Sequence, residues 1–62
     1  MLRQIGNELW GSKAEIDKAE RLLNELGMEK EIFRSSADYT FQEFLHGPEA
    51  DIRALHELVV GK

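Results

Sequence analysis

Apolar side chains recur at intervals of seven residues through the first 27 positions of the chain. The first series is Leu2, Leu9, Ile16 and Leu23, and the second, three residues later, is Ile5, Ser12, Ala19 and Leu26. This a/d heptad spacing is typical of a helix whose apolar stripe packs along another helix. It predicts a mostly α-helical fold, a small multi-helix domain with heptad-patterned N-terminal helices.

The length of 62 residues allows a single small domain, residues 1–62. A chain of about 60 residues buries only roughly 60% of the surface that its unfolded form exposes. Small domains commonly gain the missing stability from disulfides, metals or oligomerisation. The chain contains no cysteine, which excludes disulfides and thiolate metal sites. Oligomerisation remains, and it agrees with the heptad stripe.

We therefore expect the chain to form a homodimer by burying this stripe against a second helix. The predicted partner-interface residues are Leu2, Ile5, Leu9, Trp10, Ile16, Leu23 and Leu26. Trp10 lies just outside the stripe, and it is included because aromatic side chains dominate interface energetics. The alternative is a monomer in which the stripe packs on Ile52, Leu55 and Val59 of the same chain.

Charge narrows the classes of partner. Twelve acidic and eight basic residues give a net charge of −4. This balance disfavours nucleic acid, whose binding rests mainly on Lys and Arg neutralising phosphates, and it disfavours anionic lipid. The longest apolar run, residues 58–60, is too short for a signal peptide or a membrane span. We expect a cytoplasmic protein.

Residues 13–26 form the clearest predicted helix. Ser12 and Glu15 have the spacing of a capping box, which starts a helix at Lys13. Gly27 suits the left-handed position that follows a helix. These signals predict both ends of the element.

Upstream of this helix, residues 2–10 place Leu2, Ile5 and Leu9 on one helical face. The heptad phase runs through Gly11 without a slip, so one kinked helix over residues 2–26 is one alternative. The other is two helices that meet at Gly11. We favour the break, because a glycine and a good cap coincide there.

Residues 28–46 allow two interpretations. Apolar spacing supports short helices, the second one starting after Thr40. The alternative is an α+β fold, with helices packed on a β-hairpin at about residues 31–45, since its aromatic residues favour strands. Strand alternation fails at Glu43, and we favour helices. Downstream, Pro48 at a first helical position predicts a last helix over residues 48–60.

Two segments resemble known families. Residues 41–55, FQEFLHGPEADIRAL, resemble the strand-to-helix segment of flavin-binding blue-light sensor domains. That resemblance implies the hairpin; the flavin-contacting residues of the family lie mostly outside the segment, so it implies no flavin site. Residues 22–55, with LLNELGMEKEIF and DYTFQEFLHGPEADIRAL, resemble sterile alpha motif domains. That resemblance implies an all-helical module that self-associates.

No catalytic, cofactor or metal site is predicted. Glu43 and His46 have the i,i+3 spacing of carboxylate-bridged metal helices, but such sites need the motif twice, and His56 has Arg53 three residues before it. Ser35 and Ser36 carry no nucleophile-elbow pattern and read as a turn. We therefore expect no enzyme and no small-molecule substrate.

The sequence thus favours a small protein–protein interaction or regulatory module that self-associates through its N-terminal helical stripe. The alternative is a small dimeric DNA-binding transcriptional regulator, with residues 13–26 as the recognition helix of a helix-turn-helix. Lys13 and Arg21 would then contact phosphates, but Glu15, Asp17, Glu20 and Glu25 on the same helix oppose this.

Overall fold

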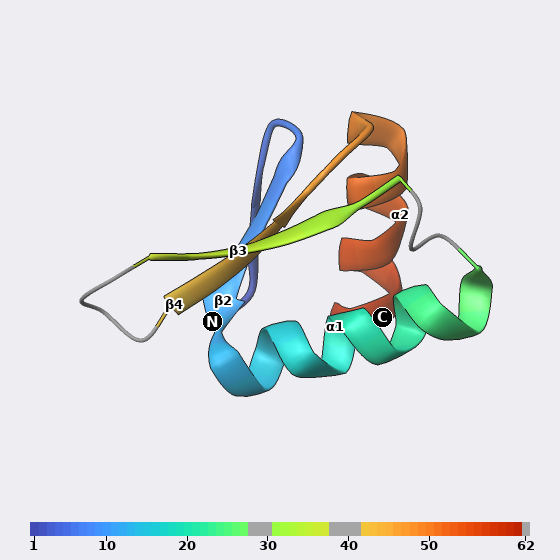
Figure 1. Ribbon diagram of the computed structural model, residues 1–62. Coiled ribbons are helices and arrows are strands. Elements are labelled where there is room, and N and C mark those ends of the chain that lie inside the picture. Colours follow the sequence, from blue (N-terminus) through green and yellow to red (C-terminus); the bar gives the residue numbers. More distant parts are fainter. Residues whose placement is uncertain (28–30, 38–41, 62) are drawn as a thin grey trace.

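The computed structural model of the chain describes residues 1–27, 31–37 and 42–61 (Figure 1). The elements in chain order are β1 (Arg3–Ile5), β2 (Glu8–Ser12), α1 (Lys13–Leu26), β3 (Phe33–Ala37), β4 (Gln42–His46) and α2 (Glu49–Val60). The fold is α+β. The prediction of a mostly α-helical domain is therefore wrong, and of the two predicted N-terminal helices only the second, over residues 13–26, is formed.

The strands form one antiparallel sheet in the order β1-β2-β4-β3. In the central pair, Trp10 of β2 lies opposite Phe44 of β4. The helices cover one face of this sheet, and they also pack on each other (Figure 1). Each half of the chain has the same topology, a β-hairpin followed by a helix, and the two halves meet along β2 and β4.

The first hairpin replaces the helix that the heptad spacing predicted for residues 2–10. Gly6 and Asn7 form the loop between β1 and β2, and Gly6 has a φ of +60°. Leu9 and Gly11 then point to the helices, and Trp10 points away from them, with the two-residue period of a strand. Leu2 and Leu9 are seven residues apart, and they lie on the same face because the hairpin turns the chain back between them.

Helix α1 begins and ends where the sequence predicts. The hydroxyl of Ser12 accepts a hydrogen bond from the Glu15 backbone N–H at 3.3 Å, and the Glu15 carboxylate accepts one from the Ser12 N–H at 2.9 Å. These two contacts complete the predicted capping box. Gly27 ends the helix in the left-handed conformation, with a φ of 75°.

Helix α2 also agrees with the sequence, within one residue. It runs from Glu49 to Val60, and Pro48 takes the N-cap position instead of the first helical one. Gly61 follows the helix with a φ of 90°.

The second hairpin, β3 and β4, corrects the helical interpretation of residues 28–46. Leu45 is buried against the helices, and its neighbours Phe44 and His46 lie on the other face. Ser35 and Ser36 belong to β3 and not to a turn. Residues 42–60 run from strand to helix, as the resemblance to blue-light sensor domains implies, and the all-helical fold is not formed. The helix start expected after Thr40 lies outside the described residues.

The core lies between the sheet and the two helices. Its buried side chains are Leu2, Leu9, Ile16, Ala19, Leu23, Ile32, Leu45, Ile52 and Leu55. Four of the predicted interface residues, Leu2, Leu9, Ile16 and Leu23, therefore stabilise the domain itself. Neither helix of the described residues is long and apolar enough to cross a membrane.

Candidate protein-binding face

The face of the sheet opposite the helices carries an unusual set of side chains. Strand alternation and the pairing register place three rows on it, and we call this surface the open face. The first row, in sheet order, is Arg3, Trp10, Phe44 and Ser35, and the second row is Ile5, Glu8, His46 and Phe33. The third row, on the other side of the first, is Ser12, Gln42 and Ala37. An antiparallel sheet with one solvated face usually carries polar residues there. Here four of the eleven positions are aromatic or large and aliphatic, and a fifth is histidine.

Trp10 and Phe44 form the centre of the open face. Their rings stack with centroids 4.3 Å apart and an interplanar angle of 10°. Because the two residues pair across adjacent strands, this stack runs across the sheet. The indole N–H of Trp10 donates a hydrogen bond to Glu8 Oε1 at 3.0 Å. The indole orientation is therefore fixed by one stacking and one polar contact.

Phe33 and His46 extend the aromatic surface toward the β3 edge. The Phe33 and His46 rings lie 5.9 Å apart at 39°, and the His46 and Phe44 rings lie 5.8 Å apart at 42°. Phe33 is 60% exposed, and Ile5, at the opposite edge, is 53% exposed. Contiguous exposed apolar surface of this kind marks interaction sites in soluble domains.

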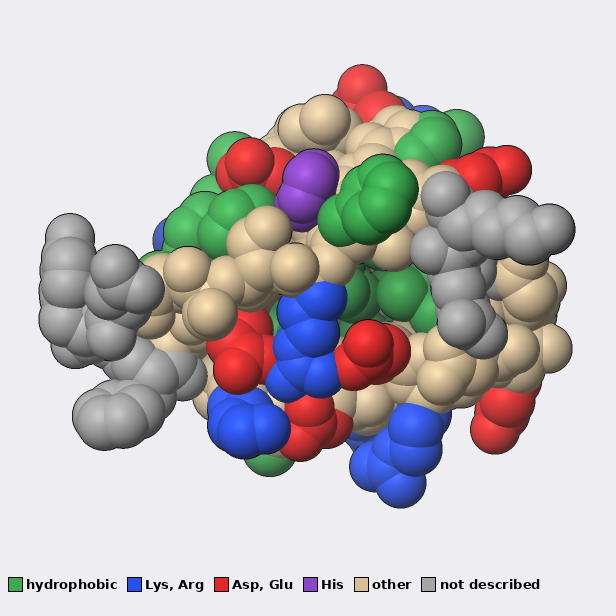
Figure 2. All heavy atoms as spheres, in the orientation of Figure 1, with side chains coloured by type: hydrophobic (Ala, Val, Ile, Leu, Met, Phe, Trp, Pro, Cys, Tyr) green, Lys and Arg blue, Asp and Glu red, His purple; other side chains and the backbone are tan. Residues whose placement is uncertain are grey.

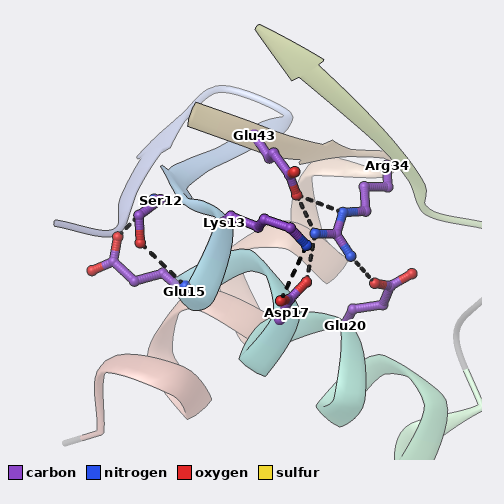
Figure 3. Close-up of polar contacts among 7 residues, drawn as sticks. All are labelled: Ser12, Lys13, Glu15, Asp17, Glu20, Arg34 and Glu43. Atoms are coloured by element: carbon purple, nitrogen blue, oxygen red, sulfur yellow. Dashed lines mark hydrogen bonds and ion pairs between the residues drawn. The ribbon is translucent and has the colours of Figure 1, made fainter. Parts of the chain in front are cut away.

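The helix-facing side of β3 and β4 carries the opposite chemistry. Arg34 points toward α1 and binds three carboxylates, two from α1 and one from β4 (Figure 3). Its Nε donates to Glu43 Oε1 at 2.8 Å, its Nη2 donates to Asp17 Oδ1 at 2.5 Å, and it also pairs with Glu20. Figure 2 shows basic side chains bordered by acidic ones at the centre of this view, with hydrophobic and histidine side chains above them.

We call these four residues the Arg34 cluster, and their charges stabilise one another. Burial opposes the charge of Arg34, but hydrogen bonds to Glu43, Asp17 and Glu20 outweigh it and raise the pKa of the guanidinium. The hydrogen bond from Arg34 lowers the pKa of the Asp17 carboxyl, and the nearby Lys13 ammonium, at 3.6 Å, lowers it further. The cluster therefore attaches the edge strand β3 to α1.

The Arg34 cluster includes Glu43, one of the two residues of the candidate metal motif Glu43 and His46. Glu43 and His46 lie on opposite faces of β4, because an i,i+3 spacing in a strand separates side chains that a helix would bring together. Glu43 is bound to Arg34. Within the described ranges no three His, Asp or Glu side chains are placed to hold a metal ion.

The remaining predicted interface residues have different positions. Ile5 and Trp10 lie on the open face, and Leu26 is 51% exposed at the end of α1. The predicted interface residues did not include Phe33 and His46. Their signal was the strand alternation of the second hairpin, which the helical interpretation set aside.

A second, smaller apolar surface lies along the end of α2. It is a shallow groove of about 730 Å³, lined by Ala54, His56, Glu57, Leu58, Val60 and Gly61. Leu58 and Val60 are 55% and 61% exposed. This groove lacks the aromatic residues of the open face.

No family model, curated protein or solved structure matches the chain. Its function is therefore inferred from the chemistry of its surfaces.

Proposed function

We propose that this chain is a small protein-binding module whose binding site is the open face of its sheet. The observation that carries the proposal is the row formed by Trp10 and Phe44, extended by Phe33, on a face that neither helix covers. Aromatic residues are the side chains that contribute most at protein interfaces. The proposed role is binding and not catalysis. We also propose that the protein is cytoplasmic, which agrees with a chain that contains no cysteine.

Rigidity supports this assignment. Trp10 is held by its stack on Phe44 and by its bond to Glu8. A side chain already fixed in the free protein loses little conformational entropy on binding. The open face is thus a preorganised apolar surface.

The alternative of a DNA-binding regulator has weaker support. Residues 3–12 form a hairpin, so α1 is not the second helix of a helix-turn-helix. On the open face, Arg3 is offset by Glu8, and Arg34 is neutralised within its cluster. Stacked aromatics on a sheet are also how single-stranded nucleic acids are bound, but affinity for phosphates needs an excess of positive charge.

A selection of displayed random peptides on the immobilised protein tests the proposal. We expect the peptides selected on the wild type to bind the Phe33→Asp variant at least about tenfold more weakly. The same peptides should bind the Leu58→Asp variant as tightly as the wild type. Phe33 and Leu58 have similar exposure, 60% and 55%, so the second variant is a matched control.

The proposal fails if no selected peptide distinguishes Phe33→Asp from Leu58→Asp. Titration of the protein with a labelled nucleic acid, single-stranded or duplex, at low salt tests the alternative of a nucleic-acid-binding protein. Saturable binding with a steep salt dependence would replace the protein-binding proposal with the nucleic-acid one.

A further inference from the structure

We propose that the occupant of the open face is a second copy of this chain, packed face to face about a two-fold axis that runs parallel to the strands between β2 and β4. This inference rests on the proposed function and names its partner. It follows from the order of residues in the two rows, from the charge of the face and from its area.

A two-fold rotation about this axis keeps each row and reverses the order of the strands. Strand β1 then faces β3 of the second copy, and β2 faces β4. In the first row, Trp10 faces Phe44 of the other copy, and Arg3 faces Ser35. In the second row, Ile5 faces Phe33, and Glu8 faces His46.

Each of these pairs is chemically compatible. Ile5 and Phe33, the exposed apolar residues at the two edges, meet and leave water together. Aromatic side chains meet at the centre, and a carboxylate meets an imidazole that can donate to it. Since every contact occurs twice in a two-fold dimer, one favourable arrangement is repeated on both sides of the axis.

A two-fold axis perpendicular to the strands can pass through the first row or between the first two rows. Through the first row, it places Arg3 on Arg3 of the other copy, so that like charges meet, and it places Phe33 on Ala37. Between the first two rows, it exchanges them. It places Trp10 on Glu8, Phe44 on His46 and Phe33 on Ser35, so each large apolar side chain meets a polar one. The row order therefore selects the axis parallel to the strands. Two aligned sheets pack with their strands at about 30° to each other. This rotation displaces the pairs nearest the axis least, and these are Trp10 with Phe44 and Glu8 with His46.

Charge also fits a second copy. The formal charges of the two rows, Arg3 and Glu8, cancel, while the whole chain carries −4. The excess negative charge therefore lies off the open face. Two copies can approach with their open faces together and their acidic surfaces apart, which keeps like charges separated.

The area sets the expected strength. Four strands about 4.8 Å apart and about five residues long give a face of roughly 19 by 17 Å. A face-to-face pair then buries on the order of 1,000 Å² in total, at the lower limit for a specific interface. We expect a dimer with a Kd in the micromolar range or weaker.

Sedimentation equilibrium from micromolar to near-millimolar concentration is the first measurement. The wild type should dimerise reversibly. Ile5→Lys alone and Phe33→Glu alone should each weaken the dimer at least about tenfold, since each change disrupts two contacts. Leu58→Lys, on the helix side, should leave the dimer unchanged, and circular dichroism checks that each variant is folded.

Mixing the two open-face variants tests the axis. In a mixed dimer of Ile5→Lys with Phe33→Glu, one edge pairs the new ammonium with the new carboxylate, and the other edge keeps the wild-type contact. We expect the mixture to recover dimer to within a few fold of the wild type. Folded variants that do not recover dimer on mixing would overturn the axis.

Other outcomes separate this inference from the proposed function. A wild type that stays monomeric throughout overturns the self-pairing, and the peptide selection then decides the proposed function by itself. A dimer that both open-face variants leave intact overturns the inference, because the second copy then occupies another surface.

Discussion

Ser12 is the last residue of β2 and the N-cap of α1, so one side chain defines the boundary between two elements. Its hydroxyl satisfies a backbone N–H that the first turn of a helix leaves without a partner. The reciprocal bond from the Ser12 N–H is the main cause of the lowered pKa of the Glu15 carboxyl. The junction is thus stabilised from both sides.

We expect Ser12→Ala to lower the free energy of unfolding by about 1 kcal/mol, the usual cost of losing an N-cap. Urea denaturation followed by circular dichroism measures the change. Ser12→Asp keeps an acceptor at the N-cap and should stay close to the wild type. Equal losses in the two variants would mean that the hydroxyl does not act as a cap.

Signals from one or two residues predicted local structure correctly where they fit only one backbone geometry. Ser12 with Glu15 predicted the capping box, and Gly27 predicted the left-handed helix end, and both are confirmed. Gly6-Asn7 is also a two-residue hairpin signal. The helical prediction for residues 2–10 did not use this signal, because residues 2, 5 and 9 also fit a helical period, and a short segment does not distinguish the two periods.

At the scale of elements, the Arg34 cluster explains how the edge strand β3 is held. This strand pairs with β4 on one side only, and its side chain Arg34 reaches the carboxylates of α1. An edge strand has fewer backbone partners than a central one. Side-chain contacts with α1 supply the second attachment.

We expect Arg34→Met to lower the free energy of unfolding by about 1–2 kcal/mol, between the values of exposed and buried ion pairs. The amides of β3 should exchange with solvent faster than in the wild type. Arg53→Met is the matched control, because among the described residues Arg53 makes only an exposed i,i+4 pair, with Glu49. Its loss should cost less than about 0.5 kcal/mol. Equal effects of the two substitutions would show that the cluster is not a specific attachment.

The element type of residues 31–46 was not determined by local sequence. The segment carries both strand-forming aromatics and a helical apolar spacing. Its strands are fixed by pairing of β4 with β2, which joins residues as far apart as Glu8 and His46. A contact over that distance leaves no signal in a short window, so no interpretation of the sequence anticipated the pairing of β4 with β2, although the alternative one gave a hairpin at about residues 31–45. The open face follows from the same pairing, and of its members the sequence predicted only Ile5 and Trp10 as interface residues.

On the scale of the whole molecule, three described carboxyls have shifted pKa values, and they divide into two groups with opposite pH dependence. The pKa values of Glu15 and Asp17 are lowered in the folded chain, so their stabilisation is present above the unfolded pKa of about 4 and is lost as pH falls through the folded values. Glu31 shares a hydrogen bond with Asp51, which raises its pKa. Its contribution is present below the unfolded pKa and is lost as pH rises through the folded value.

We therefore expect the free energy of unfolding to fall as the pH drops below about 4, because the first group outnumbers the second.

Glu31→Gln should raise the melting temperature at pH 7, where it removes repulsion between Glu31 and Asp51. It should have little effect at pH 3, where Glu31 is already protonated in the wild type. Thermal unfolding at the two pH values checks both expectations, and an equal shift at both would contradict the shared proton.

The sheet order β1-β2-β4-β3 makes this chain a tandem of two units of like topology. The first unit is β1, β2 and α1, and the second is β3, β4 and α2. In the described part of the chain, every strand pairing lies within one unit except the β2–β4 ladder, from Glu8↔His46 to Ser12↔Gln42. Cutting the connection after Gly27 would leave both hairpins continuous and make that one ladder, together with the helix contacts, a junction between separate fragments. The fold is in this sense a covalently linked heterodimer, and reassembly of the two fragments in trans would be a measure of how strongly the junction alone specifies the native pairing.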